Sequence, residues 1–433
     1  MTPARPLKVA LLGCGVVGSQ VARQMLEGGD EFQARVGRRL DLVGIAVRNL
    51  AKDRPGIDAA LLTDDAAELV ARKGIDLVIE VMGGVEPARS LILAAMAGGA
   101  SVITANKQLL AQDGPTLYEA AAEAGVDLYY EAAVAGAIPI IRPLRESLVG
   151  DEVTAVKGIV NGTTNFILDK MTTEGSSFDE VLAEAQRLGY AEDDPTADVE
   201  GLDAAAKAAI LASLAFHSRV NLDDVDCEGI TTVTADDVAT AAELGYVIKL
   251  LARCALAPDN SISVGVHPTL VPANHPLANV SGAFNAVFIE SRHAGQLMFM
   301  GPGAGGAPTA SAVLGDVITA ARNRVRGVAG PGESSYSARP VTPRNQVPSR
   351  FYVALSVDDE PGVLAKIAAS FARYQVSIQA VRQESEPGRP LGQGARLAIL
   401  THAARVGDMK AAVEDLAAMP EVTGGITLMR VEG

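Results

Sequence analysis

The chain is poor in cysteine, with only Cys14, Cys227 and Cys254 among 433 residues. They are scattered and form no Cys-x-x-Cys pair, so no disulfide framework is indicated. Long hydrophobic runs are also missing, because none reaches the ~18–20 residues needed to cross a bilayer. The N-terminal stretch "LKVALLGCGVVG" is too short and too interrupted by glycine for a secretory signal. We therefore expect a protein of the reducing cytoplasm without a membrane span.

Positive charge is scarce as well. The chain has 37 Lys and Arg against 52 Asp and Glu, a formal net charge of −15. This excess of negative charge argues against nucleic acid or an anionic membrane as the main partner, and favours a small-molecule substrate. The five histidines are dispersed, without His-x-His or His-Glu-x-x-His, so zinc is not expected. No cysteine lies in a recognisable nucleophile motif, which argues against acyl-enzyme chemistry.

The chain is long enough for two or three domains. Over residues 7–134, short apolar runs alternate with helical patterns, which predicts an α/β, Rossmann-like, doubly wound parallel sheet. The next stretch mixes strand patterns with helices expected at 201–217 and 236–255, as in an α+β domain. The C-terminal part reads as a βαββαβ unit after a Pro/Gly/Ser-rich linker. The predicted boundaries are 1–135 with a return segment at about 305–326, 136–304, the linker 327–349, and 350–433.

The first apolar run ends in "GCGVVG", in which Gly13, Gly15 and Gly18 open the following helix. Glycines at this spacing allow a tight turn, close approach of a pyrophosphate, and close packing of helix on strand. The second strand ends near Arg48, where NAD-specific folds usually carry an acid. A cation there suits a 2′-phosphate, so NADP is favoured and NAD stays possible. The longer spacing to this point is attributed to an inserted loop at 28–38.

Two lysines stand out. "ASVITANK" ends a strand, which places Lys107 at the carboxyl edge of the sheet, where ligands bind. The helix expected at 201–217 is almost pure alanine and leucine, yet Asp203 and Lys207 share its apolar face. An acidic loop containing Glu192 leads into that helix, so some of its carboxylates are expected to reach a cleft. A desolvated lysine can exchange protons with a substrate oxygen, and clustered carboxylates suit an ammonium-bearing substrate.

Seven stretches together resemble one enzyme family. They are "GCGVVGS", "ITANK", "EAAVAGAIPI", "NGTTNFIL", "LGYAEDDPTADVEGLDAAAK", "GPGAGGAPTASAV" and "DEPGVLAKIA". Over nearly its whole length the chain resembles homoserine dehydrogenase of the type with a C-terminal ACT regulatory domain. The resemblance implies reversible, NAD(P)-dependent interconversion of homoserine and aspartate 4-semialdehyde, a step of threonine, methionine and isoleucine biosynthesis.

The resemblance also implies roles for individual residues. It makes Lys207 the acid/base residue with Asp203 as its partner, and it gives Lys107 a shared role in catalysis and cofactor binding. Carboxylates that bind substrate correspond to Glu192 and Asp198. Further cofactor positions correspond to Val16, Val17, Gly189 and Gly306, beside the three glycines and Arg48. A monovalent cation, usually Na⁺, would be held mainly by backbone carbonyls at Glu131, Val134, Gly136 and Ile138.

The resemblance further implies threonine as an effector at the ACT domain, where "DEPG" forms the turn before the first helix, and a homodimer or homotetramer. Two alternatives stay open on the residues. One is an NAD(P)-dependent reductase of another amino-acid semialdehyde, which a substrate panel would distinguish. The other is a non-catalytic amino-acid sensor, against which the intact lysines and acids argue, and which a cofactor-dependent absorbance change would exclude.

Overall fold

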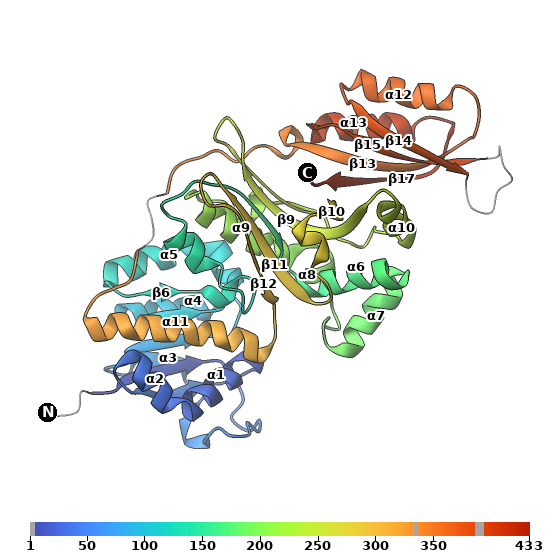
Figure 1. The fold of residues 1–433 in the computed structure, drawn as a ribbon. Helices are drawn as coiled ribbons and strands as arrows, with labels where there is room; N and C mark the ends of the chain where they lie inside the picture. Colours follow the sequence, from blue (N-terminus) through green and yellow to red (C-terminus); the bar gives the residue numbers. More distant parts are fainter. Residues whose placement is uncertain (1–4, 333–335, 386–393) are drawn as a thin grey trace. The chain divides into compact units, whose positions relative to one another are not determined.

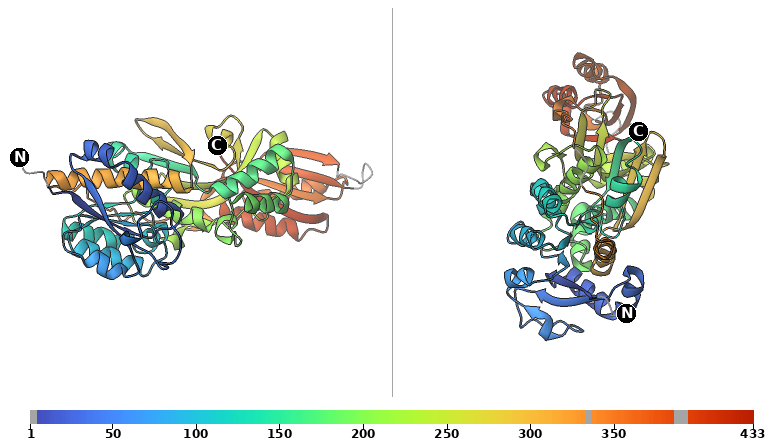
Figure 2. Two further views of the ribbon diagram at one scale, coloured as in Figure 1. Left: turned by 90° about the horizontal axis from the view of Figure 1, so that it is seen from below. Right: turned by 90° about the vertical axis from the view of Figure 1, so that its left-hand side faces the viewer.

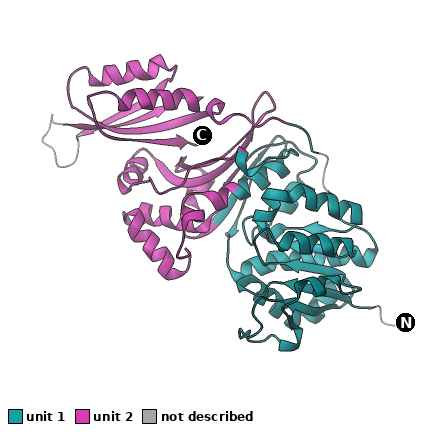
Figure 3. Cartoon of the chain, turned by 180° about the vertical axis from the view of Figure 1, so that it is seen from behind, with its two compact units in different colours: residues 1–156, 206–223, 285–338 teal, residues 157–205, 224–284, 339–433 magenta. Residues whose placement is uncertain are grey.

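A computed structural model describes residues 5–332, 336–385 and 394–433. The chain divides into two compact units (Figure 3). Unit 1 comprises residues 1–156, 206–223 and 285–338, and unit 2 comprises residues 157–205, 224–284 and 339–433. The domain boundaries expected from the sequence stay predictions. Residues 1–4, 333–335 and 386–393, which fall within them, lie outside the described residues.

Unit 1 contains a six-stranded sheet with the order β3-β2-β1-β4-β5-β6. Strand β6 is labelled in Figure 1, among the helices of this unit. All strands of the sheet are parallel, which confirms the predicted doubly wound sheet. The strand order reverses between β1 and β4, and ligands bind at such a reversal, beyond the carboxyl ends of the strands. The strands are β1 (Leu7–Leu12), β2 (Leu40–Ala46), β3 (Leu62–Thr63), β4 (Leu77–Glu80), β5 (Ser101–Thr104) and β6 (Leu128–Tyr129).

Helices cover both faces of this sheet (Figure 2). Helix α11, which comes late in the sequence, packs Val313 and Val317 into the same core as the strand residue Val9. Helix α2 stands where a loop was expected at 28–38, so that expectation is wrong. The unit's helices are α1 (Val16–Glu27), α2 (Gly29–Val36), α3 (Ala66–Ala71), α4 (Ala88–Ala97), α5 (Lys107–Ala124) and α11 (Gly306–Arg326).

Unit 2 is built on the antiparallel pair β9 (Tyr246–Leu256) and β10 (Ile262–Pro272), joined along their full lengths. The helix expected at 236–255 is therefore wrong in its second half. Gly245, with φ 80°, turns the chain after α10, and the apolar run that follows fits a buried strand as well as a helix. The other elements here are β8 (Asp226–Cys227), α6 (Gly162–Glu174), α7 (Phe178–Leu188), α8 (Thr196–Val199) and α10 (Ala235–Glu243).

Four further elements lie at the boundaries between the units or wholly in the late part of unit 1. They are β7 (Val153–Ile159), β11 (Phe284–Ser291), β12 (Gly295–Pro302) and α9 (Leu202–Ala215). Strands β7 and β11 and helix α9 each contain residues of both units, and strand β12 belongs to unit 1. Helix α9 confirms the helix expected at 201–217. Its alanines are buried, and Ala208 and Ala212 are fully enclosed. Small side chains let a helix pack closely against its neighbours, which explains the alanine-rich sequence.

The C-terminal part of unit 2 confirms the predicted βαββαβ pattern. Its strands lie in the order β17-β13-β15-β14, and α12 and α13 share a core with them. Strand β17 also pairs in parallel with β10, where Thr269 lies opposite Arg430. The elements are β13 (Pro348–Val357), α12 (Val363–Arg373), β14 (Ile378–Ser385), β15 (Ala395–Thr401), β16 (Ala404–Arg405), α13 (Val406–Ala417) and β17 (Val422–Val431).

A buried polar cluster lies at this join between β10 and β17. His267 of β10 is 5 % exposed, and its Nε2 lies 3.0 Å from Asp226 Oδ2. Arg430 of β17 donates to the same oxygen over 2.8 Å and also contacts the imidazole ring. Burial lowers the pKa of His267 to about 4, and the His267 hydrogen bond holds the pKa of Asp226 well below its usual range. The neutral ring can donate to Asp226 and accept from Arg430.

This cluster makes stability sensitive to acid. The pKa of His267 is about 4 in the folded chain against 6.5 ordinarily, so the unfolded chain binds more protons between these values. The stabilisation is complete above pH 6.5 and is lost as the pH falls through 4, because a second proton would face Arg430 and Lys410. We expect a His267→Gln variant to lose less stability than the wild type between pH 7 and pH 4. Urea unfolding at several pH values measures this, and parallel curves would contradict it.

No helix in the described part of the chain is long and apolar enough to cross a membrane.

Candidate active site

The glycine turn after β1 has the conformation that the motif predicts. Gly13 has φ 99°, and a Cβ there would lie 2.8 Å from the carbonyl oxygen of Val81. A Cβ on Gly18 would lie 2.2 Å from the Gly13 oxygen, so helix and strand meet too closely for any side chain. Gly15, by contrast, faces open space, because no atom of the described part of the chain lies within 4 Å of a Cβ built on it. The turn thus leaves one backbone position free for a ligand at the N-terminus of α1.

The start of α11 closes against this turn. A Cβ on Gly306 would lie 3.0 Å from the oxygen of Val16 and 3.2 Å from Gln20 Cγ. The predicted cofactor residues Gly13, Gly15, Val16 and Gly306 are therefore brought together although almost 300 residues separate them in sequence. Val16 itself is 75 % exposed. A large apolar side chain left open beside the turn is suited to contact a cofactor.

Cations gather beside the same turn. Arg23, Lys52 and Arg54 all act electrostatically on Cys14, which lies within the glycine motif. Burial nevertheless raises the pKa of the Cys14 thiol. The Nε of Arg54 is buried and has no hydrogen-bond partner in the structure. Such a guanidinium is prepared for an anion, and Arg48, exposed just beyond β2, adds to the positive field.

A buried polar network supports Lys107 at the carboxyl edge of the sheet. Glu80 ends β4, is fully buried, and accepts hydrogen bonds from the amides of Met82 and Gly83 and from Thr104 Oγ1. Thr104 Oγ1 accepts in turn from the amide of Asn106, whose side chain caps α5 at Leu109 N. Lys107 is the first residue of α5, so this network fixes its backbone. Sequence reasoning missed Glu80, which looked like an ordinary strand residue.

Asn161 joins two of the predicted acids in unit 2. Its Nδ2 donates to Asp198 Oδ1 over 2.6 Å and to Asp203 Oδ2 over 3.0 Å. Its own Oδ1 caps helix α6 by accepting from the amide of Thr164. Both carboxylates are half-buried and Asn161 is 5 % exposed. Sequence reasoning named the acids but missed Asn161, whose signal was an asparagine directly before the helix that starts at Gly162.

Helix α9 carries Asp203 and, one turn later, Lys207. Lys207 is only 8 % exposed, so the expectation of a buried lysine is confirmed. Glu192 is exposed before α8, and Gly189, with φ 78°, ends α7. Their roles toward substrate and cofactor stay predictions.

The predicted cation segment follows β6 in unit 1. Glu131 is 4 % exposed, and its carboxylate accepts from the amides of Ile140, Ile141 and Arg142. Burial raises the pKa of Glu131. The carboxylate is thus occupied by protein donors, which leaves the backbone oxygens as ligands. Across the described ranges, no N–H group donates to the carbonyls of Val134, Gly136 or Ile138. Free carbonyl oxygens are ligands that a hard monovalent cation accepts.

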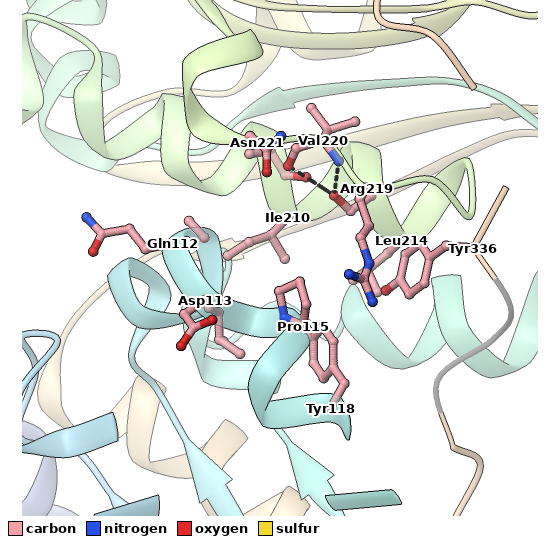
Figure 4. Close-up of a pocket in the computed structure, with 14 residues that line it drawn as sticks. Gln112, Asp113, Pro115, Tyr118, Ile210, Leu214, Arg219, Val220, Asn221 and Tyr336 are labelled. Carbon is pink, nitrogen blue, oxygen red and sulfur yellow. Dashed lines mark hydrogen bonds between the residues drawn. The ribbon is translucent and has the colours of Figure 1, made fainter. Parts of the chain in front are cut away.

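A small cavity of about 100 Å³ lies between α5 and α9 (Figure 4). It adjoins the break in α5 at Asp113, which has non-helical φ −143°, and Pro115 follows that break. Leu110 and Ile210 line it, each one turn beyond a predicted lysine. None of the predicted site residues is among the residues that line this cavity.

Lys249 shows why a displaced pKa alone does not define a catalytic group. It is fully buried, and burial lowers its pKa to about 8. Its Nζ donates to Asn165 Oδ1 over 3.0 Å and to the carbonyl of Val280 over 2.7 Å. These bonds connect β9 to helix α6 and to the loop before β11. Lys249 therefore serves the fold.

A glycine turn for a dinucleotide and a buried amine for proton exchange suit hydride transfer to or from an alcohol carbon. The chain is accordingly an NAD(P)-dependent oxidoreductase. The model of the homoserine dehydrogenase family matches residues 139–318, that of the homoserine dehydrogenase NAD-binding domain matches 13–131, and that of the ACT domain matches 351–421. The chain belongs to the homoserine dehydrogenase family.

Individual relatives agree with this assignment. The chain is 54 % identical over 436 residues to a homoserine dehydrogenase of Mycobacterium bovis, covering 99 % of this chain and 98 % of that protein. The crystal structure of a homoserine dehydrogenase from Thiobacillus denitrificans matches with a TM-score of 0.93 and 40 % identity, over 99 % of this chain and 98 % of that one. A hyperthermophilic archaeal homoserine dehydrogenase in complex with NADPH matches with a TM-score of 0.64 and 28 % identity, over 76 % of this chain and all of that one.

Proposed function

We propose that this homoserine dehydrogenase interconverts homoserine and aspartate 4-semialdehyde with Lys207 as the proton-exchanging residue. The observation that carries the assignment is helix α9, which buries an amine one turn after an acid that Asn161 holds. Lys107, fixed at the carboxyl edge of the sheet, shares the proton-transfer role and contacts the cofactor. The carboxylates of Glu192 and Asp198 bind the substrate, with Glu192 nearest its ammonium group.

In the oxidative direction, the neutral amine of Lys207 takes the proton of the substrate hydroxyl group. The hydride leaves the carbon that carries this hydroxyl group. Acceptance of that hydride is the chemistry that a bound nicotinamide cofactor would supply. In the reverse direction, the Lys207 ammonium group gives the proton to the aldehyde oxygen. Asp203, one helical turn before Lys207, orients the lysine side chain. Proton exchange with a positioned group contributes about 10²- to 10⁴-fold to a rate.

The assignment is tested with the purified chain and NADPH. We expect absorbance to fall on addition of aspartate 4-semialdehyde and to rise when homoserine is supplied with NADP⁺. Glutamate 5-semialdehyde is the matched control for the alternative of a different semialdehyde reductase. Faster turnover of that control, or no turnover of either substrate, would overturn the assignment.

The cofactor assigned here is NADP rather than NAD. Arg48, Lys52 and Arg54 support this, because they place positive charge where an NAD-specific fold places an acid. The archaeal relative was solved with NADPH. Arg48→Gln is expected to raise the KM for NADPH by about tenfold, or about 1.4 kcal/mol, and to leave the KM for NADH unchanged. Initial rates with both cofactors measure this, with Arg39→Gln as control, because the Arg39 side chain is 72 % exposed at the opposite end of β2. Equal effects on both cofactors would refute it.

Three further assignments complete the proposal. The carbonyls of Val134, Gly136 and Ile138, with the segment at Glu131, hold a monovalent cation, taken as Na⁺. The ACT domain binds threonine as an effector, and the enzyme works as a homodimer or homotetramer. Steady-state rates with and without Na⁺ and threonine test the first two assignments, and sedimentation tests the third.

A further inference from the structure

The cluster of Asp226, His267 and Arg430 ties the last strand of the chain to the short strand β8. Arg430 Nη2 donates to Asp226 Oδ2 over 2.8 Å, and their side chains are 19 % and 20 % exposed. Arg344 adds a weaker contact, with Nε 3.9 Å from Asp226 Oδ1. Gly265 gives the imidazole its place, because a Cβ there would lie 2.4 Å from His267 Cε1. Three strands thus meet on one carboxylate.

Strand β8 and the residues that follow it contact the turn between α8 and α9. Cys227 Sγ donates to the carbonyl of Glu200 over 3.3 Å, and the amide of Ile230 donates to the carbonyl of Val199 over 2.8 Å. Gly229 lies so close to this turn that a Cβ on it would be 2.2 Å from the Val199 oxygen. Residues 226–230 therefore hold the turn in place by hydrogen bonds and by direct backbone packing.

This turn, residues 199–201, lies between two acids of the predicted site. Asp198 precedes Val199 and Glu200, and Asp203 follows Gly201 at the start of α9. Asn161 binds both carboxylates but cannot by itself fix the backbone from which they project. The turn packs directly against β8, because a Cβ on Gly201 would lie 3.1 Å from Cys227 Sγ. The turn therefore has little room to shift while β8 stays in place. The backbone position of both acids consequently depends on β8.

We propose that Arg430 and Asp226 are positioning residues of the substrate site, through which strand β17 of the ACT domain holds Asp198 and Asp203 in place. The proposal rests on the proposed function, in which Asp198 binds the substrate and Asp203 orients Lys207. Removing Arg430 takes the nearer of its two arginine partners from the partly buried Asp226 carboxylate, which then keeps His267 and the more distant Arg344. That carboxylate then turns toward water, and β8 follows and loosens the turn at residues 199–201.

The test uses the full-length chain with Arg430→Gln and Asp226→Asn, singly and together. We expect each single variant to raise the KM for homoserine about tenfold, with a smaller fall in kcat and no change in NADPH affinity. The double variant should be no worse than either single one, because both remove the same contact. Arg430→Lys keeps one charged donor and should recover part of the loss.

Hydrogen exchange provides a readout that does not depend on activity. Peptides covering residues 196–205 and 226–231 should exchange faster in Arg430→Gln, while the amides of β13 should not change. Arg373→Gln is the matched control, since it breaks an ion pair with Asp415 in the same domain and does not touch β8. If Arg430→Gln fails to fold, Asp226→Asn carries both measurements.

The outcomes separate the two proposals. A lower melting temperature with unchanged KM and unchanged exchange at residues 196–205 would show a purely structural role and overturn the inference. Failure of the wild type to turn over homoserine would overturn the proposed function. Faster exchange at residues 196–205 in the variants would still show that Arg430 and Asp226 hold the turn at residues 199–201.

Discussion

The Lys207→Met variant is expected to lose about 10²- to 10⁴-fold in kcat in both directions, while its affinity for NADPH stays at the wild-type value. Lys207 is 8 % exposed on a helix lined with alanine, and the thioether of methionine fills nearly the same space. The variant therefore removes the proton-exchanging amine without opening a cavity or leaving a buried charge. The loss should fall on the chemical step, which single-turnover measurements isolate.

A matched control separates the loss of the amine from a general effect of the substitution. Lys73→Met serves as that control, because Lys73 is exposed in a loop of unit 1. Near-normal turnover in Lys207→Met would show that Lys107 or another group exchanges the proton.

Much of the fold could be predicted because its patterns are local. Continuous apolar strands between helices gave the parallel sheet, and a single glycine motif located its first turn. The run after Gly245 misled because a buried strand and a buried helix have the same composition, and only pairing with β10 decides between them. Helix α2 was missed because its apolar face is only two residues wide, Phe32 and Val36.

Residues of the candidate site could be singled out from the sequence where a charged side chain lies on an otherwise apolar helix face. Lys207 and Asp203 stood on an apolar face, which marked them in the sequence alone. Asn161, Glu80 and Arg430 carry no such mark, because an asparagine, a glutamate or an arginine at a strand or helix end is common. Their importance comes from partners distant in sequence, such as Asp226 for Arg430, and only the folded chain shows these contacts.

The Gly15→Ala variant should fold normally and bind NADPH at least about tenfold more weakly, a loss of about 1.4 kcal/mol or more. Gly15 has φ −85° and ψ −149°, outside the left-handed region that favours glycine, and among the described residues no atom lies within 4 Å of the added methyl group. Any clash must therefore come from a ligand that approaches the backbone, as a pyrophosphate does at this turn. Fluorescence titration with NADPH measures the affinity, and thermal unfolding without cofactor measures the fold.

Two neighbouring glycines make the comparison decisive. Gly18→Ala forces a methyl group against the Gly13 oxygen, 2.2 Å away, so it should lower the melting temperature even without cofactor. Gly29→Ala, at the start of α2, meets no atom within 4 Å and lies away from the turn, so it should bind NADPH normally. Replacing a helical glycine by alanine adds roughly 0.5–1 kcal/mol of stability. If Gly15→Ala binds NADPH as tightly as Gly29→Ala does, the pyrophosphate does not lie on this turn, and the cofactor site must be placed elsewhere in unit 1.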